Sequence, residues 1–578
     1  MTFCIQTAST FVTSAKDSAY SWNILLITPL VFVVRPSITT SLATMRIIDD
    51  SVIPGSVYLV DVQDKTTVTH AAGDSTIVLS PAPSNDINDP LNWSKGRKLL
   101  QVICVMIYTS AIGIGTTVLY SILQPITDDT GIPLSTLNAG TGYTFLLLGW
   151  GALINQPLAL TFGKRGIYLL SVVGNIAMCL WIPYIKTESQ WIASKIIQGY
   201  LCTPVESLCE VSIADVFFAH ERGTYIGIYT LFLFGSNYFA PLIAGFIYDG
   251  QGWHWVMYWA AIINVMALIV LFLFMEETNY VRNSSEASEA HELDGSTGSM
   301  GIDEDKRNLS SGGRETPTEL SGTPKTFVER LAIFNQRYAT NKMLVVMIYR
   351  PLIMLRFPVV FWAGFQYGTC LVWYNVLNAT ASLILSDAPY NFRASSVGLT
   401  YIGPLVGMFL GTLYSGWIGD KFAVRHARRT GGVREPEHRL WLMVVSLFLC
   451  PSSLILWGVG ASRNIHWSGL VIGMGMISCS TGIGSALSIG YALDSYKDLS
   501  GETMMAVIIV RNTLSFVIGY GITPWLHMGY QNTFISAAFV GLAITMTFMI
   551  VIRWGKSWRM ASRKIYWSYV AAGSSMAH

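Results

Sequence analysis

The sequence predicts an all-α integral membrane protein with twelve transmembrane helices in two pseudo-symmetric six-helix bundles. Of its 578 residues, 52% are hydrophobic and 12% are charged, whereas about 25% of the residues in an average soluble domain are charged. Apolar runs of roughly 20 residues, the length that crosses about 30 Å of hydrocarbon, recur twelve times. A long polar stretch separates the first six runs from the last six.

Short loops join the apolar runs everywhere except between the sixth and the seventh. Because the number of spans is even, both termini are expected on the same side of the membrane. The predicted spans are residues 99–121, 137–160, 166–185, 191–214, 224–248, 255–275, 357–382, 395–418, 440–461, 467–493, 503–526 and 532–552.

The polar stretches divide the chain into five parts. The central connection is rich in Ser, Gly, Thr and charge, so it cannot bury enough apolar area to fold. We predict a mostly disordered cytoplasmic segment, a first bundle, a cytoplasmic linker, a second bundle and a cytoplasmic tail, at residues 1–90, 91–276, 277–350, 351–556 and 557–578. For residues 1–44, an over-extended start before Met45 and a genuine interfacial segment are the alternatives, because their apolar run is too short to span.

Basic residues predict which side is cytoplasmic. The loops on one side carry 28 Lys and Arg, or 18 without the central connection, whereas the opposite loops carry three, Lys186, Arg393 and Arg463. The positive-inside rule therefore places the basic side and both termini in the cytoplasm. We expect a multi-pass protein of the plasma membrane.

Composition and motifs exclude several function classes. The net charge of +2 is too balanced for a nucleic-acid-binding protein. The eight cysteines form no CxxC pair or Cys/His cluster, and no GxxxxGK[ST] loop is present, so we expect no metal, no cofactor and no ATP drive. The compact polar cluster at residues 220–222 lacks a matching nucleophile, so we expect no enzymatic activity.

Ionisable side chains are scarce inside the predicted spans. Leaving histidine and tyrosine aside, those away from the span ends are Lys195, Glu206, Glu210 and Arg511. A bilayer penalises such charges, so they are expected where helices line a wet cavity or pair with one another. Lys195 and Glu206 are eleven residues apart, three turns plus about 20°, and Glu210 follows one turn later, about 40° round. This spacing predicts one polar stripe on span four that faces a central cavity.

Glu206 is the predicted proton-coupling or cation-binding residue, with Glu210 second. Span four enters from the outside, which puts Glu206 near the middle of the bilayer, where an ionised carboxylate is costly unless a cation is close. We hypothesise that substrate and proton compete for it; the alternative is a Glu206 held in a helix–helix hydrogen bond. For Arg511 a state-dependent or structural ion pair and direct contact with substrate both stay open.

Spans five and seven supply further candidates for the substrate cavity. Span seven contains Tyr374 and Asn375, and span five contains Asn237. Aromatic rings with a few amides suit bulky, semi-apolar ligands, although packing or the interfacial belt explains such residues as well. The four-residue glycine spacing within residues 403–411 predicts close helix packing in span eight.

Several motifs resemble the major facilitator superfamily, and within it the fungal twelve-span drug:proton-antiporter type, over roughly residues 90–560. The first span follows "NDPLNWSKGRK", and the sixth precedes "MEETNY". The stretches "QPLALTFGKRG" after span two and "GWIGDKF" after span eight resemble the same loop motif. The resemblance thus implies the major facilitator fold with an internal repeat.

The loop motif implies a conformational latch, because a short basic loop can reach helix-end carbonyls or a carboxylate of the other half. The residues concerned are Lys164, Arg165, Asp420 and Lys421. In the first copy Gln156 and Leu160 replace the glycine and the aspartate of the family, so Asp420 carries more weight. The alternative for Lys164 and Arg165 is a role in topology alone.

Two further motifs resemble antiporter signatures. In "KIIQGY" Lys195 stands where the family has an intramembrane arginine, and "GSNYFAPLIAG" resembles a Gly-Pro-rich segment. Pro241 removes one backbone hydrogen bond and lets the helix kink, and Gly245 lets a neighbour approach. Kinking and packing without a coupling role remain the alternative.

The resemblance implies a secondary active transporter that exports a drug, toxin or secondary metabolite in exchange for protons by alternating access. The alternative is a proton-coupled importer of organic cations or polyamines, because motifs do not encode direction. The expected partners are a small-molecule substrate, protons and the lipid bilayer. We expect a monomer.

Overall fold

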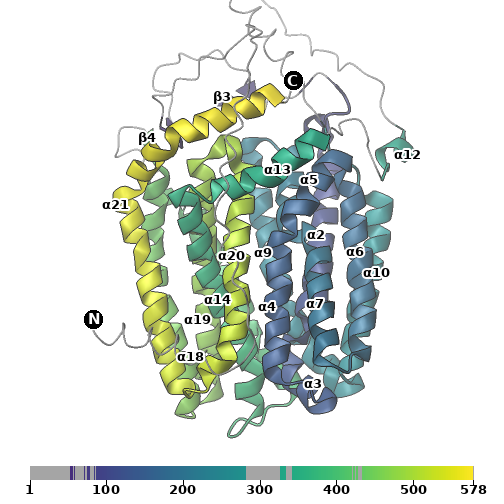
Figure 1. Ribbon diagram of the computed structural model, residues 1–578, viewed down its shortest axis with the longest axis vertical. Coiled ribbons are helices and arrows are strands. Elements are labelled where there is room, and N and C mark those ends of the chain that lie inside the picture. The colour runs from purple at the N-terminus through teal and green to yellow at the C-terminus, as the bar shows by residue number, and fades with distance from the viewer. Residues whose placement is uncertain are drawn as a thin grey trace, which may run out of the picture. The chain divides into compact units, whose positions relative to one another are not determined.

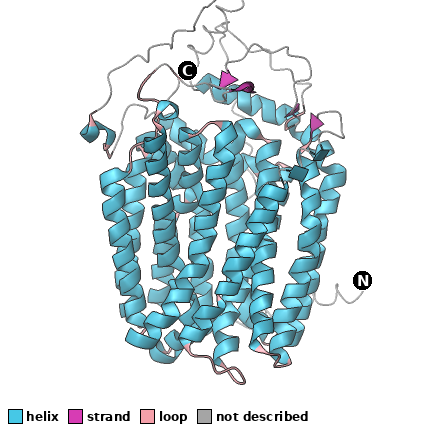
Figure 2. Cartoon of the chain, turned by 180° about the vertical axis from the view of Figure 1, so that it is seen from behind, coloured by secondary structure: helices cyan, strands magenta, loops and turns pink. Residues whose placement is uncertain are grey.

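The computed structural model describes residues 53–55, 57–58, 70–71, 74–78, 84, 86–280, 326–333, 341–419, 421–422, 425–426 and 433–576 of the chain. All of these residues belong to one compact unit, residues 50–578. Long helices form nearly all of it and stand side by side (Figures 1 and 2). The fold is therefore all-α, as the sequence predicts.

The first half of the chain forms six helical rods, several of them built from consecutive helices. The breaks have local causes: Gly163, between the second and third rods, has a φ of 117° that side chains rarely adopt, and Pro204 starts a new helix within the fourth. The rods are α2 (Lys95–Thr117) with η3 (Val118–Ile122) and α3 (Leu123–Thr130), α4 (Leu134–Trp150) with α5 (Ala152–Phe162), α6 (Lys164–Trp181) with η4 (Ile182–Tyr184), α7 (Glu188–Cys202) with α8 (Pro204–Val216), α9 (Ala219–Gln251) and α10 (Trp253–Phe274).

The second half repeats this architecture. Its rods are α14 (Pro358–Ser386), α15 (Ala394–Thr400) with α16 (Ile402–Leu413) and η6 (Tyr414–Ile418), η7 (Pro436–Met443) with α18 (Val444–Ser462), α19 (Trp467–Ser495), η8 (Lys497–Leu499) with α20 (Ser500–Leu526), and α21 (Tyr530–Met576). Outside the rods lie η2 (Pro90–Asn92), α12 (Phe327–Arg330), α13 (Asn341–Met354) and the strands β1 (Val57–Tyr58), β2 (His70–Ala71), β3 (Asp74–Val78) and β4 (Val433–Arg434).

The rods agree with the twelve predicted spans. Among the described residues, ten helices are long and apolar enough to cross a membrane, and α4 with α5, bent by 41°, makes eleven. The twelfth rod, α7 with α8, falls short on this measure because it breaks at Pro204 into helices of 15 and 13 residues and carries three ionisable groups away from its ends. The most polar of the predicted spans is thus the one that this measure of length and apolarity does not count.

Each half has its own buried apolar core. One cluster of buried side chains lies mainly in the C-terminal bundle, and two lie in the N-terminal bundle. In the C-terminal bundle α16 lies directly against α19: a Cβ on Gly407 would stand 2.0 Å from the carbonyl oxygen of Gly475. The close packing predicted for residues 403–411 is therefore confirmed.

The two bundles meet along two seams, in addition to a contact of α14 with η3 and α3. In the first, α4 and α5 pack on α20: a Cβ on Gly519 would lie 2.8 Å from the Cα of Gly142, and further along Leu153 packs with Ile509. In the second, α9 packs on α15 and α16 near the end opposite the C-terminus. We call these the α4–α20 seam and the α9–α15 seam.

Beneath the last helix lies a buried ion network. The helix α21 continues without a break to Met576 and bends across the top of the C-terminal bundle in Figure 1. Arg559, fully buried, donates to both carboxylate oxygens of Glu437 at 2.9 and 2.7 Å, to Glu435 at 2.5 Å and to the carbonyl of Pro54 at 2.6 Å. The strands β1 and β4 pair antiparallel. This network joins three segments that are far apart in sequence.

Candidate functional site

Glu206 lies in the first turn of α8, directly after the break between α7 and α8. Pro204 occupies the first position of α8, where its missing N–H has no intrahelical partner to lose. The backbone N–H of Glu206 donates to the carbonyl of Thr203 at 3.2 Å, and the side chain is only 8% exposed. The local sequence thus places a buried carboxylate in the middle of the most polar rod.

The carboxylate of Glu206 reaches across the α4–α20 seam to the other bundle. The guanidinium of Arg511, on α20, forms an ion pair with Glu206 Oε2. Asn512 Nδ2 donates to the same oxygen at 2.8 Å. Glu206 and Arg511 are 8% and 2% exposed, so this ion pair is buried and joins the two halves of the protein.

Arg511 has two further partners in the C-terminal bundle. Its Nη1 donates to the hydroxyl of Tyr367, on α14, at 2.9 Å. Its Nε and Nη2 donate to Asn512 Oδ1 at 3.3 and 3.2 Å. The guanidinium is therefore held from both sides, and its position does not depend on Glu206 alone.

Glu210 lies one turn beyond Glu206 and differs from it in two respects. It is partly exposed, and it makes no hydrogen bond or ion pair within the part of the chain that the structure describes. It lies within electrostatic range of both Arg511 and Glu206. When all three groups are ionised, the carboxylates of Glu206 and Glu210 and the guanidinium of Arg511 together carry one surplus negative charge.

Lys195 lies apart from the two glutamates. Its ammonium donates to Gln198 Oε1 at 3.1 Å and lies 4.9 Å from the centre of the Trp191 ring. Gln198 in turn donates to Asn175, on α6, at 3.1 Å. These partners all belong to the N-terminal bundle, so the structure does not bring the ammonium of Lys195 together with the two glutamates. The long Lys195 side chain packs beside Gly140 of α4 instead.

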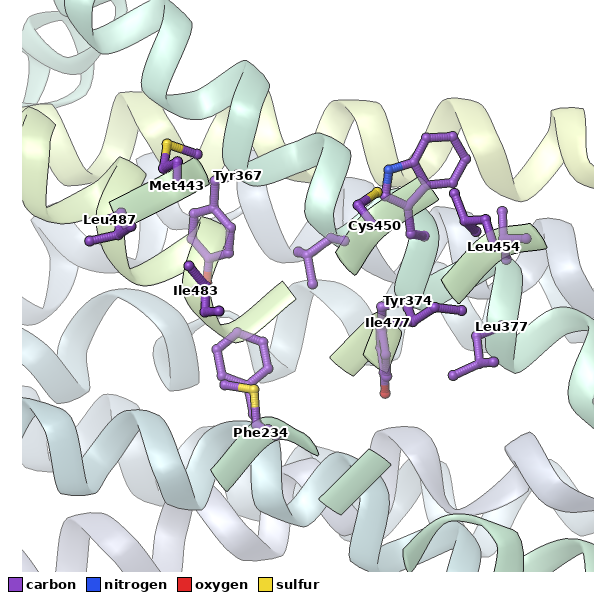
Figure 3. Packing of buried hydrophobic residues seen from close by; sticks show 14 of the residues in the cluster. Phe234, Tyr367, Tyr374, Leu377, Met443, Cys450, Leu454, Ile477, Ile483 and Leu487 are labelled. Carbon is purple, nitrogen blue, oxygen red and sulfur yellow. The ribbon is translucent and has the colours of Figure 1, made fainter. Parts of the chain in front are cut away.

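Tyr374 lies where three tyrosines from both bundles meet. Its ring centre is 6.5 Å from that of Tyr120, on η3, and 5.4 Å from that of Tyr238, on α9. Phe234, on α9, belongs to the same buried apolar core as Tyr374 (Figure 3). Within the described residues, the buried hydroxyls of Tyr374 and Tyr238 have no hydrogen-bond partner. We call Tyr120, Tyr238 and Tyr374 the tyrosine cluster.

Asn375 lines a small cavity between the bundles. The cavity has a volume of about 20 Å³, enough for about one water molecule. Tyr120 and Asn138 line it from the N-terminal half, and Asn378 from the C-terminal half. The Oδ1 of Asn375 is buried without a partner among the described residues, so a polar ligand or a water molecule fits this position.

Asn237 and the predicted kink occupy different places on α9. Asn237 lies beside Gly113 of α2, inside the N-terminal bundle. Pro241 lies within α9, and its carbonyl accepts a hydrogen bond from Ser121 at 2.8 Å. A Cβ on Gly245 would stand 2.1 Å from the carbonyl oxygen of Ala394. Gly245 therefore belongs to the α9–α15 seam.

The first copy of the loop motif is bound to its own half and to the central connection, where Arg165 donates to the carbonyl of Leu331. Lys164 forms an ion pair with Asp215, at the end of α8. Arg165 donates to the helix-end carbonyl of Phe272 at 2.7 Å, and its backbone N–H donates to Glu277 at 3.0 Å. Arg165 thus reaches a helix-end carbonyl as expected, but neither side chain contacts a carboxylate of the C-terminal bundle.

The second copy is described in part. Lys421 is exposed, and its ammonium lies 3.5 Å from the centre of the Trp417 ring. Asp420 lies outside the described residues. A metal-binding group of three or more His, Cys, Asp or Glu is absent from the described part of the chain.

Sequence reasoning missed Tyr120 and Asn138 as residues of this interface. Both stand in stretches without charge or a recognisable motif, and an apolar helix face that meets another bundle has the same composition as one that meets lipid. Asn512 follows Arg511 directly in the sequence and was visible only as its polar neighbour. The proximity of Tyr367 to Arg511 depends on how α14 packs against α20, which periodicity does not give.

Comparisons with known proteins agree with this architecture. A family model described as Major Facilitator Superfamily matches residues 105–510. An uncharacterized MFS-type transporter of Schizosaccharomyces pombe is 26% identical, over 90% of this chain and 94% of its own. A probable efflux pump, mfs2, of Aspergillus flavus is 22% identical, over 76% of this chain and 97% of its own. The crystal structure of a POT family transporter in complex with 5-aminolevulinic acid superposes with a TM-score of 0.51, at 14% identity, over 80% of this chain and 96% of its own.

Proposed function

Because the chain belongs to the major facilitator superfamily of membrane transporters, we propose that it exports small organic molecules in exchange for protons by alternating access between its two bundles. The observation that supports this proposal is the buried ion pair between Glu206 and Arg511. It joins the halves that must move relative to one another, and one of its members can accept a proton.

Protonation of Glu206 changes the strength of this contact. The ionised carboxylate is held by the charge of Arg511 and by the amide of Asn512. Breaking a buried ion pair by removing one partner costs about 3–5 kcal/mol, because the remaining charge stays buried. A proton on Glu206 removes the charge attraction, and Arg511 keeps Tyr367 and Asn512 as partners. Proton binding and separation of the bundles at this point are therefore linked.

Glu210 provides a second group that can bind a cation or a proton in the proposed exchange. It is partly exposed beside the ion pair and has no partner within the described residues, so it can receive a cation or a proton. A cationic substrate that binds at Glu210 competes with the proton for the same surplus negative charge. Tyr374 of the tyrosine cluster lies seven residues, about two turns, after Tyr367 on α14. The cluster therefore adds aromatic surface, which suits a semi-apolar ligand.

Import of organic cations or polyamines is the second candidate. The surplus carboxylate favours a cationic substrate but does not determine the direction of transport. The same site is therefore equally suited to an importer. In either case the energy source is a proton gradient rather than a bound cofactor. We place the monomeric protein in the plasma membrane with both termini in the cytoplasm.

The test uses purified protein in liposomes with an imposed pH gradient and ethidium as a fluorescent cationic probe. We expect gradient-driven ethidium movement in the wild type and its loss in Glu206→Gln, since the amide can neither take up a proton nor neutralise Arg511. Glu188→Gln is the matched control, because Glu188 lies exposed at the start of α7.

Unchanged gradient-driven transport in Glu206→Gln removes this carboxylate from the mechanism. Direction is measured separately in whole cells with and without the gene. An exporter lowers ethidium accumulation, and an importer raises it.

A further inference from the structure

The membrane-facing side of the N-terminal bundle contains a groove that the proposed transport path does not use. It is formed by α2, α9 and α10 and has a volume of about 610 Å³. This volume falls within the range of about 300–1,000 Å³ that is typical of small-molecule sites. The cavity between the bundles measures about 20 Å³, so the groove is far larger.

The groove has exposed walls and a buried floor. Its walls include Phe232 on α9 and Met266 on α10, which are 43% and 59% exposed. Its floor includes Ala111 and Ala267, which are 1% and 3% exposed. The small floor residues, together with Ser110, leave a hollow between large side chains. In hydrocarbon such a hollow is filled, because an empty one forfeits dispersion contacts along its whole lining.

We propose that this groove binds one acyl chain of a phospholipid, whose phosphate lies at Lys95. Along α2 the lining extends from Leu99 to Ala111, a rise of about 18 Å at 1.5 Å per residue. The hydrocarbon core is about 30 Å thick, so the groove has the depth of one leaflet. That leaflet is the one on the side of the termini, which we have placed in the cytoplasm.

Lys95 is the cation at the mouth of the groove. It is the first residue of α2 and lies one turn before Leu99, on the same face. Its neighbours are engaged: Arg97 pairs with Glu276, and Lys98 is buried against the ring of Phe218 at 5.0 Å. Lys95 is exposed and makes no hydrogen bond or ion pair within the described residues. Its charge therefore complements a lipid phosphate.

A lipid in this groove packs against α9, the helix that also forms the α9–α15 seam. The groove packs against one face of α9, and another face of the same helix carries Gly245 in the α9–α15 seam. Phospholipid binding thus holds α9 between the bilayer and the C-terminal bundle.

The test measures lipid retained by the purified full-length protein with native mass spectrometry, after reconstitution with phosphatidylserine, phosphatidylcholine or ergosterol. We expect one retained phospholipid per wild-type chain. Ser110→Phe fills the hollow, and excluding even two methylenes lowers affinity by about tenfold. Lys95→Gln should retain less phosphatidylserine because the phosphate loses its counter-charge.

Val265→Phe is the matched control, because Val265 lies on α10, one of the three helices that form the groove, is 40% exposed and does not line the groove. Equal phospholipid retention in Ser110→Phe and Val265→Phe overturns the proposal, and so does retention of ergosterol instead of phospholipid. If Ser110→Phe fails to fold, Ala267→Leu replaces it with the same expected loss. The readout is lipid mass, so it stands apart from the result of the transport assay.

Discussion

Asn512 joins the two members of the buried ion pair between the bundles. Its Nδ2 donates to Glu206 while its Oδ1 accepts from Arg511, so one amide bridges both members of the ion pair. Burial of an ion pair is favourable only when the remaining polar atoms are also satisfied. Asn512 supplies part of this satisfaction, and Glu210 remains beside the pair as a second carboxylate without a hydrogen bond or ion pair among the described residues.

The buried Arg559 makes a prediction about stability. In Arg559→Leu, Glu435 and Glu437 lose their shared buried partner, so we expect a destabilisation of about 3–5 kcal/mol, the cost of leaving buried charge unpaired. Thermal unfolding of the purified protein measures it. Arg553→Leu is the control, since Arg553 is exposed and has no partner within the described residues; a similar loss in both variants contradicts the prediction.

The same network gives the sign of an acid effect. Burial raises the pKa of Glu435, but hydrogen bonds from Lys556 and Arg559 lower it more, so the net pKa lies below its usual range. A carboxyl with a depressed folded pKa stabilises the protein above its unfolded pKa, and this contribution is lost as the pH falls through the folded value. Acid should therefore weaken the attachment of α21 in the wild type and less so in Arg559→Leu.

At the scale of elements, α9 contains one sequence motif with two features, a proline inside the helix and a glycine at a close contact. Pro241 and Gly245 were predicted to kink a helix and admit a neighbour. The structure identifies the neighbour as α15 of the other bundle: the carbonyl of Ala394 stands against Gly245, and Leu242 packs against Gly398. The segment therefore forms part of the interface between the halves.

Gly245→Val tests this assignment. The new Cβ would stand 2.1 Å from the Ala394 oxygen, so the seam must open, at a cost of about 1–3 kcal/mol for overpacking. We expect the outer side to open more often, and a cysteine introduced as Asn375→Cys to react faster with a membrane-impermeant thiol reagent.

Gly250→Val is the comparison for this prediction, because a Cβ at Gly250 meets open space. Equal labelling of Asn375→Cys in the Gly245→Val, Gly250→Val and unmodified backgrounds would show that the α9–α15 seam does not close the outer side.

The helices themselves could be predicted from sequence because each needs only a run of apolar residues, which is a local property. Span four was harder: Pro204 and its charges weaken the apolar signal, yet those charges made its importance visible. The pairing of Glu206 with Arg511 was open in the sequence, since the two residues are 305 positions apart and nothing local encodes how α8 faces α20. The partners of Lys195 were open for the same reason: helical periodicity gives the direction of a side chain, but not the neighbour that lies there.

At the scale of the whole molecule, the outer ends of the bundles are in contact. The backbone N–H of Ser395 donates to Asp249 Oδ2 at 3.0 Å across the α9–α15 seam. We expect a cross-link between Asp249→Cys and Ser395→Cys to hold this side closed. Under oxidising conditions ethidium transport should fall to background, and a reductant should restore it.

Each single cysteine variant serves as the control for the cross-link. The seven cysteines that the structure describes are free, and six of them are buried, which limits unintended pairing. Full transport in the oxidised double variant would mean that the outer side stays closed throughout the cycle.

The two seams differ in a way that determines how the molecule can move. The α4–α20 seam is occupied from Gly142 against Gly519 to Leu153 against Ile509, whereas the α9–α15 seam is concentrated near one end. A seam that is in contact over a long stretch can act as a hinge, whereas a seam that is in contact near one end can separate. We therefore expect the two halves to separate at the α9–α15 seam rather than at the α4–α20 seam, which would open the path of a substrate beside α9.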